Sequence, residues 1–235
     1  MSANRPEISR VLRSRREAKA TYDRLSRWYD LLEGWSETKS KNEGLRRLDV
    51  AAGERILEVG FGTGHGLVAL ARQVNQSGKV YGLDISAGML GVARQRVEKR
   101  GLMDRVDLLI GDAEAMPIAE DSFDALFMSF VLELFDTPRI PIILQECQRV
   151  LRSGGRIVVV ALSQEGDTRL MRRLYEWAHR QFPRVVDCRP IYVQRALEDA
   201  RLQILEAVER SMWGLPVEII VARRSMDGKT AHRTA

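Results

Sequence analysis

A glycine-rich loop is the first feature of this 235-residue chain that can do chemistry. Gly60, Gly62 and Gly64 alternate with other residues directly after an apolar stretch at 55–60 that is typical of a buried strand. Because glycine has no Cβ, such a loop lets the backbone approach a nucleotide-like ligand closely. The spacing differs from the dinucleotide motif G-x-G-x-x-G, because His65 stands where its last glycine belongs.

Three acidic residues accompany three consecutive predicted strands. Glu58 lies just ahead of the glycine loop, Asp84 ends the second strand and Asp112 follows the third. The carboxylate of Glu58 would repel a pyrophosphate, and it suits a ligand with a cationic amino group. Asp84 can accept both hydroxyls of a ribose, and Asp112 can bind an adenine amino group. A lone aspartate after a strand is usually a turn former, but three acids in register predict a nucleoside site.

The surrounding chain alternates short apolar strands with amphipathic helices, which predicts an α/β fold whose parallel sheet is covered on both faces. The predicted strands lie at 55–60, 79–84, 106–110, 123–130 and 156–162, and the helices at 44–50, 67–74, 87–100, 138–151 and 191–200. Two closing strands are predicted at 203–212 and 217–222. We expect a helical arm or lid at 1–50, a core domain at 51–222 with a helical insertion at 164–195, and a flexible basic tail at 223–235.

The net charge of +5 is concentrated at one end, because residues 1–27 hold eight basic and three acidic side chains. With Ile8, Val11 and Leu12 on one side, a helix there can lie on an anionic membrane surface. A lid packed on the domain, with its basic face in water, explains the pattern equally well. No apolar run is long enough for a membrane span or a signal peptide, and two cysteines are too few for a disulfide framework. We therefore expect a cytoplasmic protein, peripheral to a membrane at most.

Six segments together resemble the class I S-adenosylmethionine-dependent methyltransferases, and more narrowly the ubiquinone/menaquinone-biosynthesis branch (methyltransferase type 11 like). They are YDRLSRWYD at 22–30, ILEVGFGTG at 56–64, GLDIS at 82–86, GDAEAMP at 111–117, DSFD at 121–124 and VLRSGG at 150–155. The resemblance implies a Rossmann-like, doubly wound, seven-stranded sheet that is mostly parallel, with an antiparallel last strand. It also implies S-adenosylmethionine as the cofactor.

The resemblance assigns a part of this cofactor to each motif. Glu58 would meet the methionine portion, with the three loop glycines as the floor beneath it. Asp84 would bind the ribose, and Ser129 would face the methionine end and the transfer site. The remaining contacts are with the adenine or lie close to the cofactor, and they involve Ile85, Met89, Asp112, Ala113 and Tyr22.

The sequence defines the methyl acceptor less well, because methyl transfer needs alignment more than it needs catalytic groups. The segment FVLEL at 130–134 lacks the N-P-P-Y motif with which many amino-directed nucleic-acid methyltransferases hold a planar amine, which argues against that acceptor. Glu133 stands where quinone enzymes of this branch have arginine, which argues against quinone C-methylation. A small apolar or aromatic acceptor is favoured by aromatic residues of the arm and insertion, namely Tyr22, Trp28, Tyr29, Trp177 and Tyr192. The catalytic candidates are Glu133, Tyr22 and His65, each of which also has an ordinary structural explanation. Three scattered histidines predict no metal site.

Two other functions remain open at this point. The basic arm and a sequence pI near 9.5 are compatible with an RNA methyltransferase. No RNA-binding module is recognisable, however, so a nucleic-acid partner is not favoured. A protein that binds S-adenosylmethionine without transferring its methyl group, as a sensor or scaffold, also fits the motifs.

Overall fold

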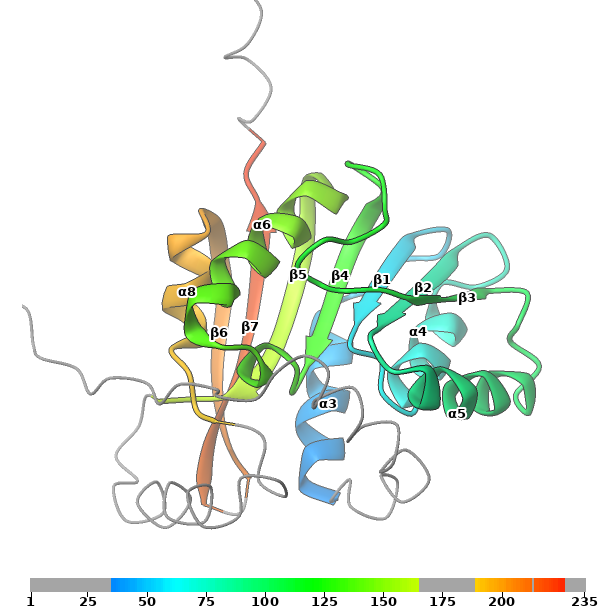
Figure 1. Ribbon diagram of the computed structural model, residues 1–235, viewed down its shortest axis with the longest axis horizontal. Helices are drawn as coiled ribbons and strands as arrows, with labels where there is room; N and C mark the ends of the chain where they lie inside the picture. The colour runs from blue at the N-terminus through cyan, green and yellow to red at the C-terminus, as the bar shows by residue number, and fades with distance from the viewer. Residues whose placement is uncertain (1–34, 165–188, 213, 227–235) are drawn as a thin grey trace, which may run out of the picture.

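The computed structural model describes residues 35–164, 189–212 and 214–226, which form one seven-stranded mixed sheet (Figure 1). The strand order is β3-β2-β1-β4-β5-β7-β6. Strands β1 to β5 run parallel, whereas β7 is antiparallel to both of its neighbours, β5 and β6. The strand bounds are β1 Arg55–Val59, β2 Lys79–Asp84, β3 Val106–Ile110, β4 Phe123–Ser129, β5 Leu151–Leu162, β6 Leu202–Met212 and β7 Leu215–Arg224. The predicted fold class is confirmed.

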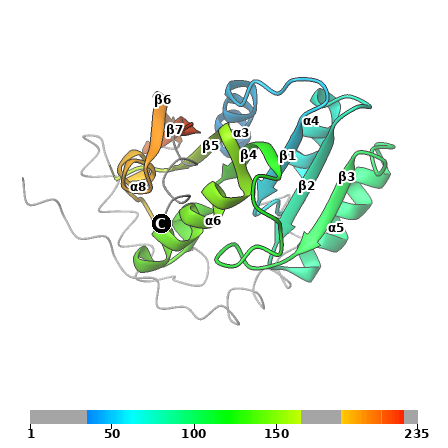
Figure 2. The same ribbon diagram turned by 90° about the horizontal axis from the view of Figure 1, so that it is seen from above.

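Helices cover both faces of this sheet, as the doubly wound prediction requires. One face carries α3 Trp35–Arg47, α4 His65–Gln73 and α5 Ala87–Glu98, and the other carries α6 Ile140–Val150 and α8 Val193–Asp199. Figure 2 shows α3 and α6 on opposite sides of the central strands. Two short 3-10 helices, η1 Leu132–Leu134 and η2 Thr137–Arg139, connect β4 to α6.

Strand side chains are buried on both faces and form two separate cores. Phe127 and Val160 belong to the core beneath α3, α4 and α5, whereas Leu126 and Val159 belong to the core beneath α6 and α8. A strand that is covered on both faces needs apolar residues at every position, which explains the unbroken apolar run at 157–162.

The helix predicted at 44–50 is wrong in its bounds, because α3 runs from Trp35 to Arg47. Gly44 lies inside this helix instead of starting it. A Cβ at Gly44 would lie 2.5 Å from Cγ2 of Val160, so the missing side chain lets α3 lie directly on β5. The close packing of helix on sheet therefore compensates for the low helix propensity of glycine.

Ion pairs join α3 to the edge strand β6. The Glu43 carboxylate forms ion pairs with Nη2 of Arg210 at 2.6 Å and with Nη2 of Arg47 at 2.9 Å. Arg47 also pairs with Glu206. Hydrogen bonds from Arg210 and Arg47 hold the pKa of Glu43 below its usual range. This part of the predicted arm is therefore packed on the sheet.

The rest of the predicted arm, including Tyr22, and most of the predicted insertion lie outside the described residues. Strand β7 continues to Arg224, two residues into the predicted tail. None of the helices in the described ranges is long and apolar enough to cross a membrane.

Candidate active site

The direction of the strand order reverses between β1 and β4, and this point defines the candidate site. From β1 the chain crosses to β2 on one side, whereas from β4 it crosses to β5 on the other. In open α/β sheets, ligands bind in the crevice outside the carboxyl ends of the strands at such a switch point. The glycine loop leaves β1 there, and residues 130–135 leave β4 beside it.

The three loop glycines all have positive φ angles, but each has its own steric reason to be glycine. A Cβ at Gly60 would lie 2.7 Å from Cγ1 of Val131, and a Cβ at Gly64 would lie 2.8 Å from Cβ of Ala93. A Cβ at Gly62 would meet no atom within 4 Å. Gly60 and Gly64 therefore allow close packing within the protein, whereas Gly62 faces open space that a ligand can use.

Glu58 is 3% exposed and lies on β1 beneath the loop. A Cβ at Gly66 would lie 2.7 Å from the carboxyl carbon of Glu58. The fourth glycine of the segment is thus needed to seat this carboxylate against the first turn of α4. This role of Gly66 was not predicted from the sequence. Its only signal there is that the alternating glycines continue from Gly64 to Gly66.

Asp84 connects the end of β2 to the glycine loop. One carboxylate oxygen accepts the backbone N–H of Gly62 at 3.0 Å, and the other accepts that of Ser86 at 2.9 Å. Because both oxygens are held by backbone groups, the carboxylate has a fixed orientation at the carboxyl end of β2. The hydrogen bond from Gly62 also links Asp84, the residue predicted to bind the ribose, to the glycine loop.

The residues predicted to surround the adenine come from the ends of two neighbouring strands. Asp84 is the register partner of Ile110, so Asp112 lies two residues beyond the same edge of the sheet. The Asp112 side chain accepts the backbone N–H of Glu114 at 2.9 Å, which is a local turn bond. Both Met89 and Ala113 are buried, and Ile85 is half-buried.

On the other side of the switch point lie Ser129 and Glu133. The Ser129 hydroxyl is buried and has no hydrogen-bond partner in the described part of the chain. The side chain of Glu133 is fully buried in η1, where Oε1 accepts the backbone N–H of Leu162 at 3.2 Å. Burial raises the pKa of Glu133 to about 8. A hydroxyl at the end of β4 and a carboxyl group of raised pKa just beyond it thus lie within five residues of each other.

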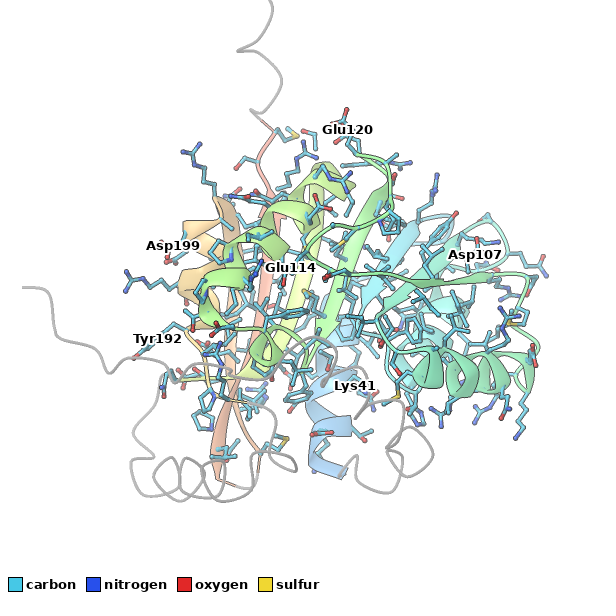
Figure 3. The ribbon with its side chains drawn as sticks, viewed as in Figure 1. Lys41, Asp107, Glu114, Glu120, Tyr192 and Asp199 are labelled. Atoms are coloured by element: carbon cyan, nitrogen blue, oxygen red, sulfur yellow. The ribbon has the colours of Figure 1, made fainter. Side chains whose placement is uncertain are left out.

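The remaining predicted residues are less closely associated with this crevice. His65 is exposed as the first residue of α4. Tyr192 is half-buried beside the start of α8, and Figure 3 shows it at the same end of the molecule as Lys41 of α3, with Glu120 at the opposite end. Tyr22, Trp28, Tyr29 and Trp177 lie outside the described residues.

Comparison with known proteins shows similarity to methyltransferases. Residues 56–155 match the family model described as "Methyltransferase domain". The chain is 36% identical over 155 residues to a demethylmenaquinone methyltransferase of Geobacillus kaustophilus (strain HTA426), which is 66% of this chain and 64% of that protein. The chain thus spans slightly less than two thirds of that relative's length.

Solved structures agree on the fold. A SAM-dependent methyltransferase from Aquifex aeolicus superposes with a TM-score of 0.65 at 22% identity, covering 84% of this chain and 97% of that one. The [4+2]-cyclase SpnF gives a TM-score of 0.70 at 17% identity, covering 89% and 96%. These superpositions show the fold of the chain, and its residues 56–155 resemble a methyltransferase domain. Its sequence relatives carry the names of quinone-biosynthesis methyltransferases, as the motifs indicated.

Proposed function

We propose that this protein transfers a methyl group from S-adenosylmethionine to a small lipophilic or aromatic acceptor. The observation that carries the proposal is the open face of Gly62, which lies beside a fixed carboxylate at Asp84 and above a buried one at Glu58. The cofactor supplies an electrophilic methyl group on a sulfonium centre. The protein's task is then to align the acceptor with that methyl group and to keep water out.

The residue assignments in this proposal follow the resemblance to the family. Asp84 binds the ribose hydroxyls, and Glu58 interacts with the cationic amino group of the methionine portion. Ser129 supplies a hydroxyl at the methionine end, where its buried oxygen has no partner in the described residues. Adenine lies among the remaining predicted residues, which are Ile85, Met89, Asp112 and Ala113.

The acceptor assignment has two supports. The first is the loop that follows β4, in which Val131 and Leu132 are buried and Phe130 and Phe135 are half-buried, so that the transfer side is largely apolar. The second is the similarity to a relative named for demethylmenaquinone, a lipophilic aromatic compound.

Isothermal titration calorimetry with S-adenosylmethionine tests the binding part of the proposal. We expect saturable binding that is lost in Asp84→Ala and in Gly62→Arg. Asp124→Ala is the matched control, because Asp124 also accepts a backbone N–H, that of Arg55 at 2.8 Å, but at the opposite edge of the sheet. Unchanged binding in both site variants would refute the proposed site.

Binding alone does not establish methyl transfer, because a fold of this kind also occurs in the [4+2]-cyclase SpnF. Release of S-adenosylhomocysteine on addition of a metabolite extract distinguishes an enzyme from a sensor. Transfer requires one molecule released for each acceptor methylated, and a sensor releases none.

A peripheral membrane contact belongs to the same proposal and rests on the basic residues within 1–27. If they dock the protein on anionic lipid, full-length protein floats with anionic liposomes and a variant without residues 1–20 does not. Equal flotation of the two proteins would remove the idea.

A further inference from the structure

Glu133 is a buried carboxyl group at the carboxyl ends of the two central strands β4 and β5, which lie side by side in Figure 1. Oε1 accepts the N–H of Leu162, the last residue of β5. Oε2 is buried and has no hydrogen-bond partner in the described part of the chain. A buried carboxyl oxygen without a partner is costly, so its retention points to a role beyond packing.

The loop that carries Glu133 packs against the glycine loop. Val131, two residues before Glu133, lies directly against Gly60 of the glycine loop. Phe130 has a positive φ of 55°, which turns the chain sharply as it leaves β4. The loop thus packs on the cofactor side of the switch point, and Glu133 lies between that contact and the end of β5.

The charged groups around Glu133 come from two other segments. Arg189 is 1% exposed and donates from Nη2 to the carbonyl of Phe135, immediately after η1. Its positive charge lowers the pKa of Glu133, whereas the negative charge of Glu37 on α3 raises it. The backbone N–H groups of Glu133 itself and of Leu162 on β5 also lower the pKa. The rise in pKa caused by burial exceeds all of these effects, and the carboxyl group therefore has a pKa of about 8.

We propose that Glu133 is a catalytic base that removes a hydroxyl proton from a phenol- or hydroquinone-type acceptor. The inference rests on the proposed function and narrows its substrate class. In the step, a bond forms between the acceptor oxygen and the methyl carbon. The methyl carbon–sulfur bond breaks with its electron pair left on sulfur, and the hydroxyl proton moves to the carboxylate of Glu133. Where the neighbouring ring carbon is methylated instead, the resulting dienone then loses its ring proton to solvent and its oxygen regains a proton.

The acceptor class follows from matching basicities. A phenolic hydroxyl ionises near pH 10, so an ordinary glutamate is a poor base for it. A carboxylate made more basic by burial is better matched, because general-base efficiency is greatest when the pKa lies near the working pH. A charged methyl donor beside Glu133 would favour the carboxylate form, so cofactor binding should expel a proton from it.

The first test measures this proton release and needs no acceptor. Calorimetric titration of S-adenosylmethionine near pH 7, in two buffers of different ionisation enthalpy, gives the protons released on binding. We expect wild-type protein to release a fraction of a proton and Glu133→Gln to release none, with Kd values within about threefold of each other. Glu54→Gln is the control, because Glu54 pairs with Arg156 at 2.7 Å before β1 begins and should behave as wild type.

The same titration separates the two hypotheses. If S-adenosylmethionine does not bind the wild-type protein, the proposed function fails. If it binds and the proton release is the same in Glu133→Gln, only the present inference fails. Should Glu133→Gln not fold, carboxyl NMR of wild-type protein with ¹³C-labelled glutamate still decides. One resonance should titrate near pH 8 and move to lower pH with the cofactor, and its absence would overturn the proposal.

The second test measures methyl transfer to a probe panel of 1,4-dihydroxynaphthalene, hydroquinone and catechol. We expect kcat to fall by about 10²-fold or more in Glu133→Gln, the usual range for loss of a general base, with KM for S-adenosylmethionine unchanged. In wild-type protein, kcat should rise with pH until the carboxylate is fully formed, and this rise should be lost in the variant. A wild-type protein inactive on every hydroxylated probe, or a variant with the wild-type pH profile, would overturn the proposal.

Discussion

The different environments of two glycines give a direct test of the candidate cofactor site. Gly62 and Gly101 both have positive φ angles, 52° and 66°, and a Cβ on either would meet no atom within 4 Å. Only Gly62 lies in the crevice, whereas Gly101 follows α5 on the way to β3. Alanine at either position therefore creates the same backbone strain without a clash. The two variants should differ only in what the added methyl group meets when a ligand binds.

The expected magnitudes follow from this geometry. A left-handed alanine costs roughly 1–2 kcal/mol, and the smaller entropy of the unfolded chain returns about 0.4–1 kcal/mol of that. Both Gly62→Ala and Gly101→Ala should therefore lower the free energy of unfolding by about 0.5–1.5 kcal/mol, or Tm by roughly 1–6 °C. Only Gly62→Ala should weaken S-adenosylmethionine binding, by about tenfold or more, which corresponds to about 1.4 kcal/mol.

Urea denaturation and calorimetric titration of the two proteins, purified in parallel, provide these numbers. Wild-type affinity in Gly62→Ala would refute the claim that the open face of Gly62 is filled by the cofactor. An equal loss of affinity in Gly101→Ala would show that backbone strain, not occupancy, controls binding.

Three further predictions concern stability. Ser86→Ala removes the side chain that accepts the N–H of Met89 at the start of α5 and should cost about 1 kcal/mol in chemical denaturation. Gly91→Ala should raise stability by about 0.5–1 kcal/mol, because this exposed glycine lies inside α5 with open space at its Cβ position; a lower Tm would contradict the packing of α5. Glu43 has a pKa lowered by Arg210, so its contribution is present above the ordinary glutamate pKa and is lost as pH falls through the folded value. Glu43→Gln should therefore flatten the acid side of the stability profile, and an unchanged profile would show that the ion pair is inactive in solution.

Local sequence patterns predicted the elements whose ends are marked by local signals. Strands β2 and β3 have the predicted bounds, since each is a short apolar run that ends near an aspartate or glycine. The start of β5 was missed because it depends on a distant strand. Leu151 pairs with Phe123 before the register shifts, so β5 starts five residues earlier than the strand predicted at 156–162. No local pattern reports such a pairing.

In the candidate site, too, local signals could be predicted from the sequence and distant contacts could not. The glycine loop and Asp84 could be singled out by type and spacing, whereas Glu133 could be singled out only as a departure from the family's pattern. The partners that position them could not, because they are distant in sequence. Ala93 packs against Gly64, and Arg189 binds the carbonyl that follows η1. Such contacts arise only once helices and strands have been packed together.

Transfer of a labelled methyl group tests the central claim most directly. The protein is incubated with S-adenosylmethionine labelled in its methyl group and with a metabolite extract supplemented with 1,4-dihydroxynaphthalene, and the small molecules are separated by mass spectrometry. We predict that one small, lipophilic or aromatic compound gains the label, that S-adenosylhomocysteine appears in equal amount, and that both signals are lost in Asp84→Ala. Saturable cofactor binding with no labelled product and no S-adenosylhomocysteine above the Asp84→Ala background would contradict the account.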